Sequence, residues 1–348
     1  MSTNQKTRDY LFDNYKAFLI ALVVIGHFIE PNYTNNQFLY TLKWLIVSFH
    51  MPAFIFISGY FSKRHLPLNV LVQKLAIPYI AYEIIYYLFY TFITHKETGL
   101  YLLHPKFSLW YILALFIWRF ATPYVEKLPH HMILSIVAGL LIGASDMSDN
   151  FLSIPRILVF YPFFLAGIHF ERSQLTKIQH SLPRSLAAAG VIGFTIITAC
   201  VIPYINCSPK IFYGRYNYHF LGQGILEGMA CRLICYAIGF GMTFAVMLLI
   251  ENGKTFYSYI GQRTMAIYLF HGLTYSYLKD CTDLLKNVTT AQETVLLLLF
   301  CLCLTGIFSA LPLTAFTNVF AGVKLPKYFI PENTYLRNIA RYQYMGLA

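Results

Sequence analysis

Long apolar stretches separated by short polar segments run along most of this chain. At about 1.5 Å of rise per residue, each stretch is long enough as a helix to cross most or all of the roughly 30 Å hydrocarbon core of a bilayer. The pattern predicts an all-α, polytopic membrane bundle, and we expect residues 1–348 to form a single transmembrane domain. About ten transmembrane helices are predicted, near 14–31, 38–62, 70–94, 107–125, 130–146, 153–171, 184–204, 224–250, 255–278 and 293–320.

The composition agrees with a membrane protein. Hydrophobic residues make up 57% of the chain and charged residues 12%, with a mean hydropathy of +0.54, whereas soluble domains carry about 25% charged residues. Lysine and arginine are concentrated in the segments that face inward if the N-terminus is inside, which predicts cytoplasmic N- and C-termini in a multi-pass cell-membrane protein. These basic loops and anionic lipid explain the net charge of +11, so no nucleic-acid partner is expected.

Two ionisable residues share one face of the first apolar segment. Lys16 and His27 are eleven positions apart, which in a helix gives about 16 Å of rise and returns the side chains to the same face. Ionisable groups inside a membrane are costly and usually face a protein interior or a watery cavity, where they serve a function. Because the chain contains 26 Lys+Arg and 11 His, this spacing needs further support before it counts as a motif.

Two further histidines lie inside predicted helices. His50 is two residues before Pro52, which lacks an amide hydrogen and should kink the second helix beside the imidazole. His271 lies near the middle of the ninth predicted helix, where Tyr268, three residues earlier, shares its face. A structural role for His50 is as compatible with this pattern as a catalytic one.

The cysteines do not indicate a metal or redox centre. There are seven, most of them within apolar segments, and none forms a CxxC pair. We interpret them as small buried hydrophobic residues, and no metal site is expected.

Six segments occur in order along nearly the whole chain: D-N-Y-K-x10-H, FHMPAFIFISGYFSKR, LAIPY, SLWYILALFIWR, FYPFFLAGIHF and G-x-x-T-M-x-I-Y-L-F-H. Together they resemble the acyltransferase 3 family, in the style of its fucose 4-O-acetylase-like branch. The family's Arg/Lys-x10-His motif falls on Lys16 and His27. The resemblance implies a ten-helix integral membrane enzyme that moves an acyl group, usually acetyl from acetyl-CoA, onto a sugar hydroxyl of an envelope glycan.

His27 is the expected catalytic group of such an enzyme. An imidazole can take the alcohol proton as a general base or carry the acyl group transiently as a nucleophile. Glu30 follows on nearly the same face and could orient the ring, although a solvated residue at the outer helix end fits the sequence equally well. His50 and His271 complete the expected catalytic set.

A second group of residues is expected to bind the donor. Lys16, Arg64 and Arg263 would hold the phosphates of an acyl-CoA at the cytoplasmic rim, although Arg64 is also typical of a positive-inside anchor. The expected supporting residues are Asp13, Ser58 and Tyr268. Acetyl-CoA or another acyl-CoA would be a co-substrate, and no bound cofactor is expected. The expected partners are an envelope glycan or lipid-linked sugar acceptor, membrane lipids and glycan-assembly proteins.

Two other classes of protein remain compatible with the sequence. A secondary transporter or a flippase for envelope sugars would also be a bundle of about ten helices with buried ionisable residues. However, the chain shows no clear internal repeat and no matched pair of broken helices. An accessory membrane protein whose histidines only pack is the third class.

Overall fold

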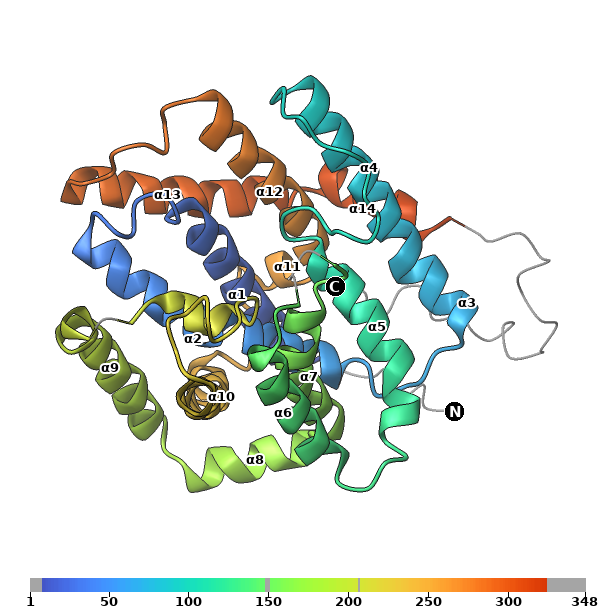
Figure 1. Ribbon diagram of the computed structural model, residues 1–348, viewed down its shortest axis with the longest axis vertical. Coiled ribbons are helices and arrows are strands. Elements are labelled where there is room, and N and C mark those ends of the chain that lie inside the picture. Colours follow the sequence, from blue (N-terminus) through green and yellow to red (C-terminus); the bar gives the residue numbers. More distant parts are fainter. Residues whose placement is uncertain (1–7, 148–150, 206, 324–348) are drawn as a thin grey trace.

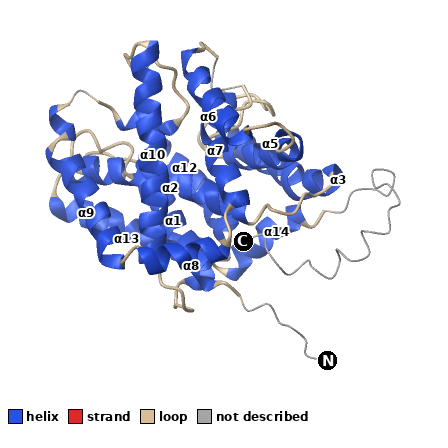
Figure 2. Ribbon diagram, turned by 90° about the horizontal axis from the view of Figure 1, so that it is seen from below, coloured by secondary structure: helices blue, strands red, loops and turns tan. Residues whose placement is uncertain are grey.

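The computed structural model describes residues 8–147, 151–205 and 207–323. Within these residues every regular element is helical, as Figure 2 shows, and this confirms the predicted all-α class. Short helical turns at Val72–Ala76, Ile142–Ala144, Ile202–Tyr204 and Pro209–Tyr213 join or extend the main elements. The α-helices are α1 (Tyr10–Phe28), α2 (Gln37–Tyr60), α3 (Leu68–Leu71), α4 (Ile77–Phe92), α5 (Trp110–Val125), α6 (His131–Leu141), α7 (Ile154–His169), α8 (Arg172–Ser181), α9 (Arg184–Cys200), α10 (Ile225–Leu249), α11 (Ser258–Gly261), α12 (Thr264–Cys281), α13 (Ala291–Phe308) and α14 (Leu311–Ala321).

Several helices are long and apolar enough to cross a membrane, in agreement with a multi-pass membrane protein. In the described residues there are six, or up to seven if α7 and α8, which meet at 93°, form one broken span. Other predicted spans form shorter helices, so the number of about ten stays a prediction. The predicted cytoplasmic termini concern chain ends, 1–7 and 324–348, that lie outside the described residues. The six spans are Tyr10–Phe28, Gln37–Tyr60, Leu68–Phe92, Arg184–Tyr204, Ile225–Leu249 and Ala291–Phe308.

The structure divides two of the predicted helices and adds one. The stretch 293–320 forms α13 and α14, because Pro312 has no amide hydrogen to continue the helical ladder and instead begins the second helix. The stretch 255–278 is likewise divided into α11 and α12. Residues 172–181, expected as a polar connection, form α8, whose first turn is stabilised by a capping box that begins at Glu171.

The helices α1 and α2 lie near the centre of the bundle (Figure 1), where they contact most of its other members. Helix α1 packs against α2, α11, α12 and α13, whereas α2 packs against α7, α9 and α10. The α2–α7 crossing is very close: a Cβ atom at Gly59 would overlap the carbonyl oxygen of Phe164, and one at Gly167 would overlap that of Phe56. Small residues at this crossing therefore allow the two backbones to touch.

The start of α1 lies at the same end of the bundle as the end of α2 and the start of α8. Arg172 contacts Asp9, the N-cap residue of α1, with 3.0 Å between Nε and Oδ2, and the Lys63 ammonium donates to the carbonyl of Phe170. Asn14 joins the segment before α11 to this end by donating to the carbonyls of Glu251 and Gly253, both at 2.8 Å. The other end of α1, which carries His27, therefore belongs to the opposite end of the bundle.

Candidate active site

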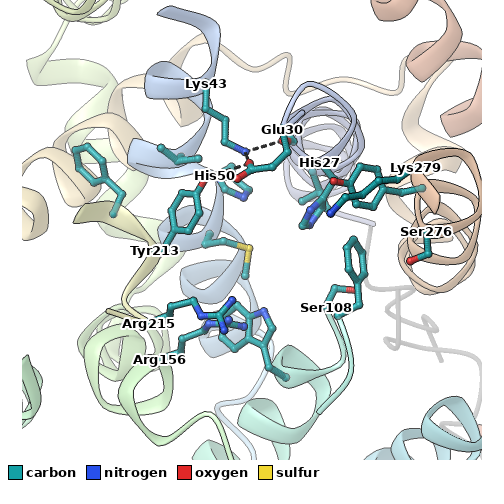
Figure 3. A pocket seen from close by; sticks show the side chains of 18 of the residues that line it. His27, Glu30, Lys43, His50, Ser108, Arg156, Tyr213, Arg215, Ser276 and Lys279 are labelled. Carbon is teal, nitrogen blue, oxygen red and sulfur yellow. Dashed lines mark hydrogen bonds and ion pairs between the residues drawn. The ribbon is translucent and has the colours of Figure 1, made fainter. Parts of the chain in front are cut away.

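A cavity of about 370 Å³ opens at the His27 end of α1. Figure 3 shows its lining, which comes from α1, α2, α4, α5, α7, α12 and the segments around them. Its volume falls in the range of small-molecule sites, about 300–1,000 Å³. Aromatic rings make up much of the wall. The charged and imidazole side chains of the lining are His27, Glu30, Lys43, His50, Lys96, Arg156, Arg215, Lys279 and Asp280.

The His27 ring is surrounded by other rings on the α12 side of the cavity. Its centroid lies 4.7 Å from that of Phe107, 5.4 Å from that of His271 and 6.1 Å from that of Tyr275. Phe107 has a φ of 48°, in the left-handed region that phenylalanine seldom adopts, so the surrounding packing must hold it there. Two of the expected catalytic histidines, His27 and His271, are thus neighbours although they are far apart in the sequence.

The contacts of His50 and His271 determine which ring nitrogen of each carries the proton. Nδ1 of His50 lies 2.7 Å from the carbonyl oxygen of Ile46, and Nδ1 of His271 lies 2.9 Å from that of Ile267. A carbonyl oxygen only accepts, so Nδ1 is the donor in both rings, and in a neutral imidazole Nε2 then carries the lone pair. His271 is fully buried, and its Nε2 has no hydrogen-bond partner among the described residues. Both rings therefore present a basic nitrogen.

Glu30 lines the cavity but is held by residues other than His27. Its carboxylate forms an ion pair with Lys43 and accepts hydrogen bonds from the Tyr213 hydroxyl at 3.1 and 3.3 Å. Burial and the Glu30 carboxylate raise the pKa of Tyr213, so this hydroxyl keeps the proton that it donates. The Lys43 ammonium also donates to the carbonyl of Gly26 at 2.7 Å. Through Lys43, Glu30 supports the backbone next to His27.

The expected supporting residues Ser58 and Tyr268 connect α2 and α12 to the start of α5. The Ser58 hydroxyl lies 2.5 Å from that of Tyr111, whose ring is 6.0 Å from the ring of Tyr268. The Tyr268 hydroxyl donates to the carbonyl of Ser108, a residue of the cavity wall. Through these contacts Ser58 and Tyr268 hold the part of the cavity wall near the start of α5 in position.

The expected donor-binding residues lie elsewhere. Lys16 is buried and contacts Asp13, with 3.3 Å between Nζ and Oδ1, and Asp13 also accepts from Gln262 of the α11–α12 connection. The Arg263 guanidinium donates to the carbonyl of Ser309 at 3.0 Å, where α13 ends.

Arg64 is exposed in the segment after α2. Neither Arg64 nor Lys16 nor Arg263 lines the cavity, so the residues expected to bind the donor and those expected to be catalytic occupy different regions.

A family model described as an acyltransferase domain matches residues 9–314. The chain belongs to the acyltransferase 3 family. Membership confirms the resemblance seen in the sequence and classes the chain as an acyltransferase. The matched range includes every residue of the expected catalytic, donor-binding and supporting sets.

One curated relative of this family member is similar over a short segment. It is nodulation protein NolL of Sinorhizobium fredii (strain NBRC 101917 / NGR234), which is 41% identical over 64 residues. The segment is 18% of this chain and 18% of that protein, so the match spans less than a fifth of either. No solved structure matches the chain.

Several residues of the cavity were not expected in the site. Lys43 and Arg156 are ionisable residues within predicted helices, which is a signal of function, but nothing in the sequence relates them to His27. In the sequence, Arg215 and Lys279 are ordinary basic residues of predicted connecting segments. Nothing in the pattern marks Tyr213 as a functional residue. They reach the cavity because the segment after α9 and the end of α12 fold over the end of α1.

Proposed function

We propose that this protein is a membrane-bound O-acyltransferase that moves an acyl group, acetyl in the first instance, from acyl-CoA to a hydroxyl of a cell-envelope sugar or polysaccharide. The observation that carries the proposal is the placement of His27, the histidine of the family's motif, on the wall of a cavity beside His50 and in ring contact with His271. In an acyltransferase family member, such a cluster supplies the base that acyl transfer to an alcohol requires.

His27 acts either as the general base or as a transient acyl carrier. As a base, its neutral imidazole removes the proton of the sugar hydroxyl while the oxygen attacks the thioester carbonyl. The C–S bond then breaks, an ester forms, and the proton passes from the imidazolium to the departing thiolate of CoA. As a carrier, the imidazole attacks the thioester carbonyl, the C–S bond breaks and CoA thiolate leaves. The sugar hydroxyl then attacks the acyl-imidazole, the ester forms, the neutral imidazole is regenerated, and the hydroxyl proton is balanced by the proton that the thiolate takes up.

We propose that donor and acceptor approach from opposite ends of the bundle. Lys16, Arg64 and Arg263 belong to segments assigned to the cytoplasmic side, where acyl-CoA would be held by its phosphates. The mouth of the cavity contains Lys96 and Lys279, both exposed and both in segments assigned to the outer side. In this proposal the protein is a cell-membrane protein with about ten spans and cytoplasmic termini, and it meets its glycan or lipid-linked acceptor, and glycan-assembly partners, outside.

The test is acetyl transfer by the purified protein from radiolabelled acetyl-CoA to envelope glycan. We expect His27→Ala to lower kcat by about 10²-fold or more, the usual contribution of a positioned base, while His219→Ala, an exposed histidine outside the cavity, has no effect. His27→Gln, whose side chain is closer in size to histidine, replaces the alanine variant in the assay if that variant does not give a monodisperse protein. Equal transfer by wild type and both His27 variants would remove His27 from catalysis. Movement of glycan into proteoliposomes without donor consumption would instead indicate a transporter.

A further inference from the structure

The cavity carries an excess of positive charge. Five cationic side chains line it against two carboxylates, so the formal excess is three with the histidines neutral. Both carboxylates are engaged by a lysine: Glu30 by Lys43, and Asp280 by Lys96 at 2.5 Å. The space in which His27 acts therefore lies in a positive field, and fields in a cleft attract ligands of the opposite charge.

The cations are distributed from the mouth of the cavity to its interior. Lys279, in the last turn of α12, is exposed at the mouth. Arg156, in the first turn of α7, and Arg215, in the segment before α10, are half-buried. Figure 3 shows both arginines on the same side of the cavity, away from the Lys43–Glu30 pair. An anion that enters at Lys279 would thus meet two guanidinium groups further in.

Aromatic rings hold the two guanidinium groups. That of Arg156 lies 4.9 Å from the centroid of Trp110, and that of Arg215 lies 5.4 Å from the centroid of Tyr216. Stacking of this kind keeps the planar donor groups oriented, and oriented guanidinium groups match the two oxygens of a carboxylate or phosphate. The same rings give the apolar faces that small-molecule sites use beside a few polar groups.

We propose that the acceptor is an anionic sugar, whose carboxylate or phosphate is bound by Arg156, Arg215 and Lys279 while one of its hydroxyls faces His27. This inference rests on the proposed acyltransferase function and specifies its substrate class. The group bound by the cations is an oxyanion in either case. It is the carboxylate of a uronic acid or the phosphate of a sugar phosphate, such as the headgroup of a lipid-linked sugar.

The first measurement compares acceptors, with wild-type protein and radiolabelled acetyl-CoA. p-Nitrophenyl β-D-glucuronide and p-nitrophenyl β-D-xyloside present the same ring hydroxyls and differ only in the carboxylate. Glucose 1-phosphate and methyl α-D-glucoside form the corresponding pair for phosphate. We expect kcat/KM to be at least about tenfold higher for the anionic member of one pair, the effect of one charge-assisted contact. The pair that shows this preference identifies the oxyanion.

The second measurement assigns the preference to the cavity cations. Arg215→Gln and Lys279→Gln should each raise the KM of the anionic acceptor by about tenfold and leave the KM of acetyl-CoA unchanged. Arg215→Lys, which keeps the charge, should retain most of the preference. The matched control is Lys286→Gln: this exposed lysine pairs with Asp283 outside the cavity, and its removal should change neither KM.

Three outcomes would overturn the inference. Equal kcat/KM within both pairs, with acetyl reaching every acceptor, rejects the anionic acceptor and leaves the acyltransferase function standing. A higher KM for acetyl-CoA in the Gln variants would assign these cations to the donor's phosphates. The third outcome applies when no acceptor, envelope glycan included, receives acetyl and the proposed function has failed. Equilibrium dialysis of the same four sugars, radiolabelled for this purpose, is then the test, and equal binding within both pairs overturns the inference. Tighter binding of an anionic sugar would support its recognition by the cavity cations.

Discussion

Replacing Lys43 by methionine should both destabilise the bundle and slow transfer. The methionine side chain is similar in length, but it lacks the ammonium that forms the ion pair to Glu30 and the hydrogen bond to the Gly26 carbonyl. The Lys43 side chain is 5% exposed and that of Glu30 34% exposed, so the pair lies between a surface pair and a buried one. Breaking buried pairs costs about 3–5 kcal/mol and surface pairs contribute about 0–1 kcal/mol. We therefore expect a loss of about 2 kcal/mol.

A double-mutant cycle separates this pair from general effects of substitution. In a chain of this size a loss of about 2 kcal/mol corresponds to a fall in Tm of about 3 °C, measurable by size-exclusion chromatography after heating in detergent. Lys43→Met combined with Glu30→Gln should cost less than the sum of the single variants by about 2 kcal/mol, because the second change removes the carboxylate left without its lysine. In the Lys96–Asp280 pair the lysine side chain is 46% exposed, against 5% for Lys43, so the same test should show a coupling below about 1 kcal/mol.

The same substitution tests the support of His27. Because Gly26 precedes His27, losing the Lys43 hydrogen bond should loosen the backbone that carries the imidazole, and we expect kcat to fall by about tenfold. If the losses in unfolding free energy of the two single variants add up to that of the double variant within about 0.5 kcal/mol, the Lys43–Glu30 pairing is refuted. An unchanged kcat in Lys43→Met would refute the positioning role, whatever the change in stability.

Three further substitutions, with Gly190→Ala as a control, test the other end of α1 and the central crossing. Asn14→Ala removes four hydrogen bonds, to Glu251, Gly253, Thr255 and Ser258, and should cost about 2–4 kcal/mol in thermal unfolding; a loss below about 0.5 kcal/mol would contradict that network. Gly59→Ala places a methyl group on the Phe164 carbonyl and should cost about 2 kcal/mol or more, while Gly190→Ala, which meets no atom within 4 Å, should be neutral or stabilising by about 1 kcal/mol. Lys16→Gln should raise the KM of acetyl-CoA without changing that of the acceptor, and an unchanged donor KM would remove Lys16 from the donor site.

The division of α13 and α14 illustrates what a hydropathy pattern leaves open. The apolar run over 293–320 is continuous in composition, and only Pro312 indicates a boundary. A proline can begin, kink or end a helix, and tertiary contacts select among these results. Here Arg263 donates to the carbonyl of Ser309 at the break and thereby satisfies a backbone group that the interrupted helix leaves free.

The candidate site likewise contains some residues that a local pattern relates and others that only packing brings together. His27 and Lys16 were recognisable because their spacing is local, and a single helix fixes the separation between them. The partner of Glu30 was not recognisable, because Lys43 and Tyr213 come from two other segments and reach the carboxylate only after these have packed together. The sequence is compatible with a Glu30 that orients His27 and equally with a solvated Glu30 at the outer helix end; in the structure the Glu30 carboxylate pairs with Lys43.

The sequence by itself determined the properties that depend on composition and on local periodicity: an all-helical membrane chain, membership of the acyltransferase 3 family, and a histidine placed eleven residues beyond a lysine on one helix. Only the tertiary structure decided which residues share the space around that histidine. The contact of His27 with His271 and the gathering of Arg156, Arg215 and Lys279 in one cavity join segments that lie far apart in the sequence. Such proximity results from helix packing, which no local pattern records.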